Sequence, residues 1–179
     1  QGIVLETRLD AGPAAILGDP TQVHQVLMNL ATNAIQAMPA GGTLTVSLEV
    51  FHSESARPAT VGNLSVGEYI RLTVADCGGG ISHEIIDKIF DPFFTTKETG
   101  VGTGLGLSLV HGIVMDLRGA VDVRSRPGAG STFTVHLPRS GDALDAVDHR
   151  VPTLPSGKGE CVLVVDDEEV LVKLAARTL

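Results

Sequence analysis

The sequence predicts an α/β (α+β) sandwich, in which a mixed β-sheet of about five strands is covered on one face by about three helices. Strand-like alternation and helix-like periodicity follow one another along the chain, beginning with "IVLETRL" at residues 3–9. Hydrophobic residues make up 43% of the 179 residues and charged residues 19%, which is enough apolar material to bury a core. The pattern "AVDVRSRPGAGSTFTVHLP" at residues 120–138 predicts a closing hairpin, which makes the sheet mixed rather than wholly parallel.

The first helix is expected directly after Asp19, because aspartate caps helix N-termini and the following Pro20 suits the first helical position. Apolar residues then recur at spacings of three to four from Val23 to Ala37, which predicts one buried helix face. Pro39 and the glycines after it end this helix. Alternating apolar residues predict strands at 3–9, 43–51 and 68–75, with 14–17 as a further candidate.

The second half of the main domain contains two more expected helices. The polar stretch 52–67 is interpreted as a loop, and residues 83–90 as a short helix. A segment rich in glycine and threonine without periodicity, residues 91–104, precedes a helix over 105–118 that Gly119 ends. The hairpin strands are expected at 120–125 and 131–138.

Composition divides the chain into three parts. Residues 1–138 carry the periodic elements of one domain, residues 139–159 read as a linker rich in Gly, Asp, Pro and Ser, and residues 160–179 begin a new strand and helix. The net charge of −8 without a basic cluster argues against nucleic acid as a partner. No apolar run is long enough for a membrane helix, so no membrane contact is expected. Cysteine occurs only twice, which favours a reducing compartment, the cytoplasm.

Four glycines at alternate positions from 100 to 106 stand directly before the 105–118 helix. Backbone N–H groups that converge on a phosphate often need positive φ angles, which glycine allows, and a following helix adds free N–H groups and a positive dipole end. The chain contains no GxxxxGK[ST] motif, and the glycine spacing does not fit GxGxxG. A flexible loop without a ligand is the alternative interpretation.

Three further segments contain candidate ligand-binding residues. Asn29 and Asn33 are four residues apart and share one helix face, where their amide oxygens could ligate Mg²⁺. Asp76 ends a strand before three glycines and could accept a hydrogen bond from the adenine amino group, while Lys97 could contact phosphate oxygens. Each alone could instead be an ordinary surface residue or an ordinary turn residue.

Taken together, "NLATNA" (29–34), "DCGGGI" (76–81), "IFDPFFTTK" (89–97) and "GTGLGL" (102–107) resemble the four motifs of bacterial sensor histidine kinases, in the same order. The last strand, "GAGSTFTVHLP" at 128–138, also resembles that family. The resemblance covers roughly residues 1–138. It implies the ATP-binding fold that these kinases share with gyrase-like, chaperone and mismatch-repair ATPases, and it implies ATP and Mg²⁺ as ligands.

The resemblance also assigns roles to residues. Asn33 would ligate Mg²⁺, with Asn29 near the metal or the phosphates, and Asp76 would read adenine. Segment 91–104 would be the ATP lid, and Thr132 would lie behind the base near Asp76. The base pocket would be formed by Gly78, Gly80 and Ile81, and the phosphates would be held by Lys97 and by the backbone of Gly102, Thr103, Gly104, Leu105, Gly106 and Leu107. The family pattern Asp-x-Gly-x-Gly is here filled with Cys77, which thiol reagents could modify, and Gly79.

The identity of residue 29 favours a kinase over a hydrolase. The sister ATPases place a glutamate one turn before the metal asparagine, as general base for water, whereas an amide cannot take up a proton. The phosphate acceptor would then be a histidine on a dimerisation hairpin outside this chain. None of the six histidines fits the family's acceptor position: His24, His52, His83, His111, His136 and His149. A phosphohydrolase of the same superfamily and a nucleotide-gated interaction module remain alternatives.

The tail "CVLVVDDEEVL" resembles the first strand and helix start of a response-regulator receiver domain. Asp166 and Asp167 match the acidic pair that helps to hold Mg²⁺ in such domains. The resemblance implies a hybrid histidine kinase with the receiver domain as a further partner. An ordinary strand–turn–helix with a solvated acidic cap is the alternative.

Overall fold

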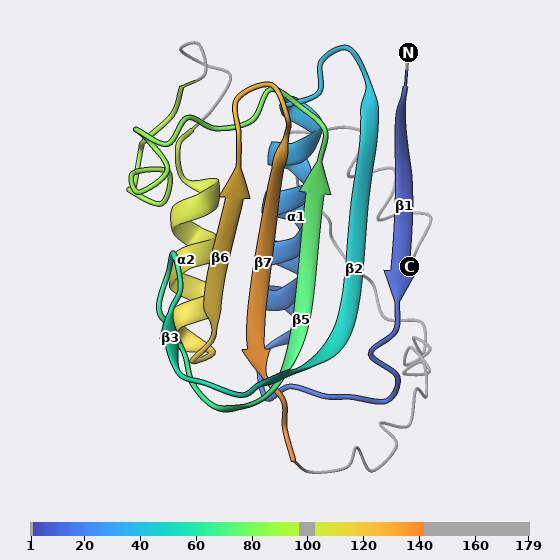
Figure 1. Ribbon diagram of the computed structural model, residues 1–179, viewed down its shortest axis with the longest axis vertical. Coiled ribbons are helices and arrows are strands. Elements are labelled where there is room, and N and C mark those ends of the chain that lie inside the picture. Colours follow the sequence, from blue (N-terminus) through green and yellow to red (C-terminus); the bar gives the residue numbers. More distant parts are fainter. Residues whose placement is uncertain (1, 97–102, 142–179) are drawn as a thin grey trace, which may run out of the picture. The chain divides into compact units, whose positions relative to one another are not determined.

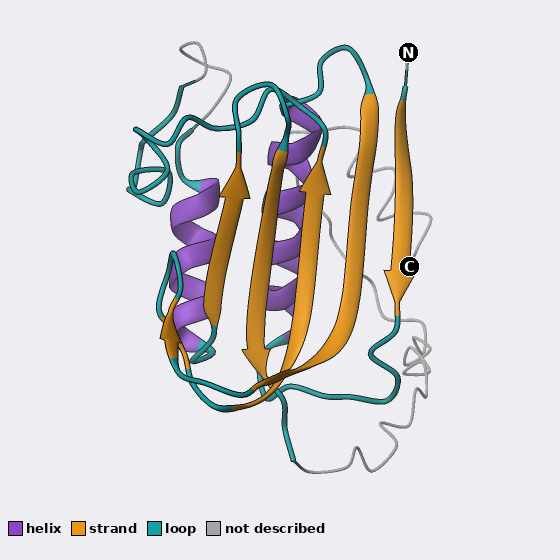
Figure 2. Cartoon of the chain, in the orientation of Figure 1, coloured by secondary structure: helices purple, strands orange, loops and turns teal. Residues whose placement is uncertain are grey.

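The computed structural model describes residues 2–96 and 103–141. Its five-stranded sheet has the order β1-β2-β5-β7-β6, and two helices cover one face of it (Figures 1 and 2). The strands are β1 (Ile3–Leu9), β2 (Gly42–Ser53), β5 (Gly67–Asp76), β6 (Ala120–Ser125) and β7 (Ser131–Pro138). Strand β1 runs parallel to β2 and the other neighbours are antiparallel, so the predicted mixed sandwich is confirmed.

Helix α1 (Pro20–Gln36) begins as the sequence predicts. The Asp19 carboxylate accepts a hydrogen bond from the backbone N–H of Thr21 at 2.7 Å, which satisfies one of the free donors of the first turn. Val26, Leu30 and Ala34 form the buried stripe of the helix. They face the core side of the sheet, where the buried Val74, Phe133 and Val135 contribute to the same cluster.

Helix α2 (Gly106–Asp116) is shorter than the predicted 105–118 and ends in a Schellman-type turn. The N–H of Gly119 donates to the carbonyl of Val114 at 2.8 Å, and the N–H of Arg118 donates to that of Met115 at 2.9 Å. Arg118, not Gly119, holds the left-handed backbone conformation, with φ of 55°. Gly119 is needed for space instead, because a Cβ there would lie 2.5 Å from the carbonyl oxygen of His136.

Three further elements differ from the prediction. Residues 14–17 form no strand and make only a bridge between Ile16 and Arg139. Residues 83–90 are consecutive turns rather than a helix, and the described part of the chain therefore has two helices instead of about three. Their N–H groups bond three residues back, as in Lys88 to Ile85, so that the α-helical ladder does not form. The predicted loop 52–67 contains two short strands, β3 (Arg57–Pro58) and β4 (Asn63–Leu64).

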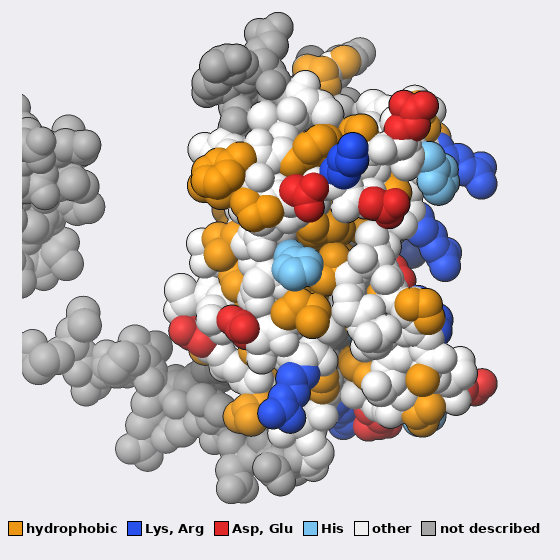
Figure 3. Space-filling view, turned by 90° about the vertical axis from the view of Figure 1, so that its left-hand side faces the viewer, with side chains coloured by type: hydrophobic (Ala, Val, Ile, Leu, Met, Phe, Trp, Pro, Cys, Tyr) orange, Lys and Arg blue, Asp and Glu red, His pale blue; other side chains and the backbone are white. Residues whose placement is uncertain are grey.

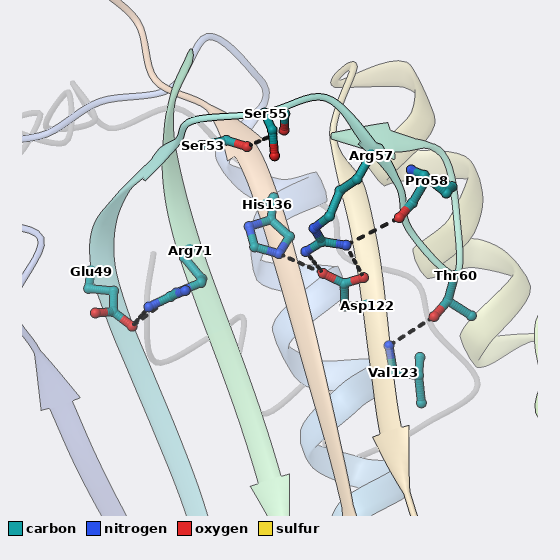
Figure 4. A network of polar contacts seen from close by, with 10 residues as sticks. All are labelled: Glu49, Ser53, Ser55, Arg57, Pro58, Thr60, Arg71, Asp122, Val123 and His136. Carbon is teal, nitrogen blue, oxygen red and sulfur yellow. Dashed lines mark hydrogen bonds and ion pairs between the residues drawn. The ribbon is translucent and has the colours of Figure 1, made fainter. Parts of the chain in front are cut away.

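The β3–β4 segment lies beside β6, the edge strand of the sheet, where Val61 bridges to Val121, and its Arg57 reaches over the face away from the helices (Figure 4). Leu64, Tyr69 and Ala120 form a small second core there. A polar network lies beside it: Asp122 on β6 accepts hydrogen bonds from Arg57 and lies 3.2 Å from Nε2 of the buried His136. Burial lowers the pKa of His136, and the hydrogen bond from Arg57 lowers the pKa of Asp122.

Among the residues that the structure describes, no helix combines the length and the apolar content that are needed to cross a bilayer.

Candidate functional site

A cavity of about 620 Å³ opens where α1, α2 and the loops at one end of the sheet meet. Its volume lies in the range that is typical of small-molecule sites. No lining residue among those described carries a charge. The lining comprises Asn29, Thr32, Asn33, Gln36, Ala37, Gly79, Gly80, Ile81, Ser82, Ile85, Ile89, Phe94, Thr95, Thr96, Thr103, Gly104, Gly106, Leu107, Ser131 and Phe133.

Helix α1 supplies a polar stripe to the cavity. Asn29, Thr32, Asn33 and Gln36 are spaced by three, one and three residues, which places all four on one side of the helix. The stripe borders the buried apolar one, so the same helix anchors the core and lines the cavity. The sequence prediction contained the two asparagines but not Thr32 and Gln36, although the helical spacing from Asn29 would have identified both.

Asn29 and Asn33 meet the first residue of α2. A Cβ placed on Gly106 would lie 3.4 Å from Asn29 Oδ1 and 3.8 Å from Asn33 Nδ2. Asn29 Nδ2 is buried and has no hydrogen-bond partner among the described residues. A buried donor without an acceptor is costly. The described residues therefore offer no acceptor at this point, and a phosphate oxygen would supply one.

The N-terminus of α2 points its free backbone groups at the cavity. Leu105 occupies the N-cap position and gives no side-chain hydrogen bond to the helix, and the first turn holds no acidic residue. The first N–H groups are thus left for a ligand, and the helix dipole favours an anionic one. Gly106 and Leu107 line the cavity, whereas Leu105 does not.

Thr103 and Gly104 also line the cavity, just before the helix. Gly104 has φ of +67°, and a Cβ there would overlap the backbone of Phe93. The Phe93 N–H donates to the Gly104 carbonyl at 2.9 Å, which ties the two ends of the expected lid together. Phe94 points into the core and the cavity, whereas Phe93 is 74% exposed.

Asp76 lies at the end of β5, just behind the cavity wall. Its Oδ1 accepts hydrogen bonds from the N–H groups of Gly78 at 2.8 Å and Ser131 at 3.2 Å. Ser131 lines the cavity, whereas Asp76 itself does not. The hydrogen bonds that the described residues give to this carboxylate all go to Oδ1, and Oδ2 remains as an acceptor.

The glycine-rich loop after Asp76 holds its shape through close backbone contacts. A Cβ on Gly78 would overlap the carbonyl group of Ala37 at the end of α1, and one on Gly80 would overlap the carbonyl group of Arg126. Gly80 lines the cavity, as predicted, but Gly78 does not, because it packs against α1. The additional Gly79 lines the cavity.

Ile81 and Cys77 flank this glycine loop. Ile81 lines the cavity, and its N–H donates to Ser125 Oγ at 2.7 Å. Cys77 has an exposed free thiol that accepts a hydrogen bond from the N–H of Thr43 at 3.2 Å.

Thr132 lies beside Ala75 in the sheet, next to Asp76, but its side chain points away from the predicted base pocket. Successive residues of a strand point to opposite faces, and Phe133 and Val135 of β7 point into the core, so Ser131 shares their face and Thr132 does not. Ser131 therefore lies at Asp76 and in the cavity, and Thr132 lines a different cavity. The alternation in "STFTVHLP" would have identified Ser131 from the sequence.

The remaining predicted site residues lie outside the described residues. They are Lys97, Gly102, Asp166 and Asp167.

Comparison with known proteins agrees with this geometry. A family model described as "Histidine kinase-, DNA gyrase B-, and HSP90-like ATPase" matches residues 18–141. The chain belongs to this ATPase family. The match begins just before the α1 N-cap and ends after β7, so it includes every described element of the cavity.

Curated relatives of this ATPase domain are named as sensor kinases. The chain is 37% identical over 185 residues to sensor kinase CckA of Brucella abortus, with 98% of this chain and 20% of the relative covered. It is 43% identical over 123 residues to sensor histidine kinase ZraS of Escherichia coli K12, with 69% of this chain and 23% of the relative covered. The chain thus spans about a fifth of the length of these relatives.

Solved structures share the fold. A full-length ShkA structure in complex with AMPPNP matches with a TM-score of 0.61 at 26% identity, covering 79% of this chain and 27% of that one. The nucleotide-free catalytic domain of histidine kinase ThkA matches with a TM-score of 0.56 at 30% identity, covering 75% of this chain and 80% of that one.

Proposed function

We propose that this ATPase domain is the catalytic domain of a sensor histidine kinase, which binds Mg-ATP in the cavity between α1 and α2 and donates the γ-phosphate to a histidine outside this chain. The observation that carries the proposal is the convergence of Asn29 and Asn33 on Gly106, where the buried Asn29 Nδ2 has no acceptor from the described part of the chain. The relatives named as sensor kinases and the AMPPNP complex of ShkA support it.

The donor set fits a Mg²⁺-bound triphosphate. The Asn33 amide oxygen is a hard ligand for Mg²⁺, which usually takes its other ligands from phosphates and water. Asn29 Nδ2 would donate to a phosphate oxygen, and the free N–H groups of α2 would hold the chain of phosphates. Bound Mg²⁺ would neutralise the charge of the phosphates. This matters because no described lining residue is cationic; Lys97 would add the missing positive charge.

The base would lie against the glycine-rich loop. Asp76 Oδ2 would accept from the adenine amino group, while Oδ1 stays bound to Gly78 and Ser131. Gly79, Gly80 and Ile81 would form the wall of the base pocket. Because the two oxygens of Asp76 would have different partners, one carboxylate could hold the loop and recognise the base at the same time.

The cavity favours transfer over hydrolysis. In the described lining, no carboxylate or imidazole is placed to take a proton from water, and residue 29 is an amide. The γ-phosphate would therefore wait for an external nucleophile. None of the described histidines lines the cavity. We infer that the acceptor histidine belongs to the dimerisation hairpin of the same protein, in the cytoplasm of a bacterium.

The surface beside the cavity suits an apolar partner helix. Phe93 is 74% exposed, Leu105 42% and Leu109 40%, and Figure 3 shows hydrophobic side chains reaching the surface in patches on this side of the molecule. Scattered apolar residues are common on protein surfaces, but these three adjoin the start of α2. We infer that the acceptor hairpin docks here.

For residues 160–179 we propose the start of a receiver domain. The alignment with sensor kinase CckA covers 98% of this chain and hence includes most of this tail. Asp166 and Asp167 would then contribute to the Mg²⁺ site of that domain. In the full-length protein, substituting both with alanine should abolish acid-stable, alkali-labile phosphate on the receiver and leave phosphate on histidine; unchanged alkali-labile phosphate would contradict the assignment.

The test of the kinase proposal is incubation of this chain with ATP labelled at the γ-phosphate. We expect label to move to a separately supplied acceptor hairpin, with little free phosphate released in its absence. Steady phosphate release without the hairpin would instead support the phosphohydrolase alternative. Nucleotide binding with neither transfer nor release would support the nucleotide-gated interaction module.

A further inference from the structure

A second cavity, of about 400 Å³, lies beside the first and, unlike the first, has charged side chains in its described lining. Among the described residues it is lined by two arginines, Arg124 and Arg126, and by His83. No described carboxylate lines it. In a chain with a net charge of −8, this is an unusual gathering of hydrogen-bond donors.

The two arginines are available to a ligand. Elsewhere in the described residues, Arg57, Arg71 and Arg139 are each paired with a carboxylate. Arg124 and Arg126 form no such ion pair within the described part of the chain, and both are exposed. Guanidinium groups present several fixed N–H donors that match the oxygens of phosphate and carboxylate groups.

The rest of the lining suggests a ligand that is larger than a single inorganic ion. Ile86 and Val123 contribute apolar surface, and Thr132 contributes a hydroxyl group. The volume exceeds that of a single phosphate and lies at the lower end of the range for small-molecule sites. Because side chains alternate along β7, Thr132 lines the second cavity and not the first.

The two cavities share a wall. Ser125 lines the second cavity, and its hydroxyl group accepts from the Ile81 N–H at 2.7 Å and lies 3.0 Å from Ser131 Oγ, two residues of the first cavity. The Gly128 N–H donates to the Gly79 carbonyl at 2.8 Å, which joins the β6–β7 turn to the loop of the first cavity. A ligand that displaces this turn would therefore displace the wall of the first cavity.

We propose that the second cavity is an effector site for a small molecule whose phosphate or carboxylate groups pair with Arg124 and Arg126 and whose less polar part contacts Ile86 and Val123. Occupancy of this site changes the affinity of the first cavity for nucleotide through Ser125 and the β6–β7 turn. This second statement rests on the proposed nucleotide site, whereas the anion site itself does not.

The test is NMR titration of the arginine Nε–H signals, with inorganic pyrophosphate and citrate as the phosphate and carboxylate probes. We expect saturable shifts of the Arg124 and Arg126 signals with at least one probe, and the stronger probe identifies the preferred group. The double variant Arg124→Gln/Arg126→Gln should bind that probe about tenfold or more weakly, because charge-assisted hydrogen bonds are lost. Arg8→Gln/Arg118→Gln removes the same charge elsewhere and should bind as the unaltered chain does.

Equal weakening in the two double variants, or the absence of saturation with both probes, would overturn the proposal. Asn33→Ala distinguishes binding in the second cavity from binding in the first, because Asn33 lines only the first. Unchanged binding of the probe supports the second site, and lost binding would assign the anion to the first cavity. Calorimetry with AMPPNP and Mg²⁺, with and without the probe, then measures the coupling. Failure of AMPPNP to bind the unaltered chain would refute the nucleotide site alone, whereas normal AMPPNP affinity at saturating probe would refute the coupling.

Discussion

Gly106 lies beside Asn29 in the lining of the first cavity, and a Cβ on residue 106 would lie 3.4 Å from Asn29 Oδ1. This is an ordinary van der Waals distance, so the fold tolerates a methyl group there. The space that it would fill is where the free N–H groups of α2 and the amides of α1 meet. We therefore expect the absence of a side chain at residue 106 to serve the proposed ligand rather than the packing.

Gly106→Ala should weaken nucleotide binding without lowering the stability of the fold. We expect the melting temperature to stay level or rise, because alanine is favoured over glycine within helices by about 1 kcal/mol. Affinity for AMPPNP with Mg²⁺ should fall about tenfold, since the methyl group would occupy the proposed phosphate position. Gly112→Ala is the matched control, because a Cβ at Gly112 meets nothing within 4 Å. If both variants bind the nucleotide equally, the phosphates do not lie at Gly106.

Asp76→Asn tests the base-reading role. The asparagine Oδ1 can keep both hydrogen bonds from Gly78 and Ser131, so stability should change little. The second oxygen is replaced by an NH₂ donor, which faces the adenine amino group donor to donor, so ATP affinity should fall about tenfold or more. Calorimetry compares Asp76→Asn with the control Asp87→Asn, an exposed site with the same change of charge. Unchanged affinity in Asp76→Asn would remove this residue from the site.

Acid should destabilise the network on the other face of the sheet. The hydrogen bond from Arg57 lowers the pKa of Asp122, so its stabilisation is complete above the ordinary value of 3.8 and is lost as pH falls through the lower folded value. Burial lowers the pKa of His136, so the folded state keeps the imidazole neutral and loses stability as pH falls below 6.5. Both groups therefore favour unfolding in acid.

Asp122→Asn measures this contribution by urea unfolding. We expect a loss of about 1–3 kcal/mol at neutral pH, since hydrogen bonds to a charged group are lost. The difference from the unaltered chain should shrink as pH falls below 3.8. Glu49→Gln serves as control, because the Glu49 side chain is 42% exposed against 22% for Asp122, and its pair with Arg71 should contribute under about 1 kcal/mol. A pH-independent difference for Asp122→Asn would rule out the ionised pair as its source.

Arg118→Gly should stabilise the chain. Arg118 holds φ of 55°, a left-handed conformation that costs a residue with a side chain about 1 kcal/mol and costs glycine little. The Arg118 side chain is exposed, so little packing is lost. Thermal unfolding should show a higher midpoint than the unaltered chain, whereas Arg8→Gly, in the extended strand β1, should show a lower one. A lower midpoint for both would mean that the Arg118 side chain stabilises the fold.

Periodicity in the sequence was sufficient to predict α1, the main strands and the closing hairpin. It was misleading at residues 83–90, where Ile85, Ile86 and Ile89 have helical spacing but the backbone forms successive turns. The strands β3 and β4 have two residues each, which is too short for any alternation to show. Their position depends on the packing of Leu64 with Tyr69 and Ala120, and Ala120 is distant in sequence.

The candidate site was predicted best where one element supplies it. Asn29 and Asn33 follow from the spacing on a single helix, and Gly106 follows from its place at the start of the next one. Ser131 was missed because its role depends on which face of β7 meets Asp76, a matter of register between strands. The contacts of Gly78 with Ala37 and of Gly80 with Arg126 join segments that no local pattern connects.

The most direct test of the account is calorimetry of AMPPNP with Mg²⁺ against the unaltered chain, Asn33→Ala and the control Asn63→Ala, whose side chain is exposed on β4. We predict one nucleotide per chain, equal affinity in Asn63→Ala, and affinity about tenfold or more lower in Asn33→Ala, with similar melting temperatures for all three. Equal affinity in Asn33→Ala and Asn63→Ala, or no binding to the unaltered chain, would contradict a Mg-ATP site between α1 and α2.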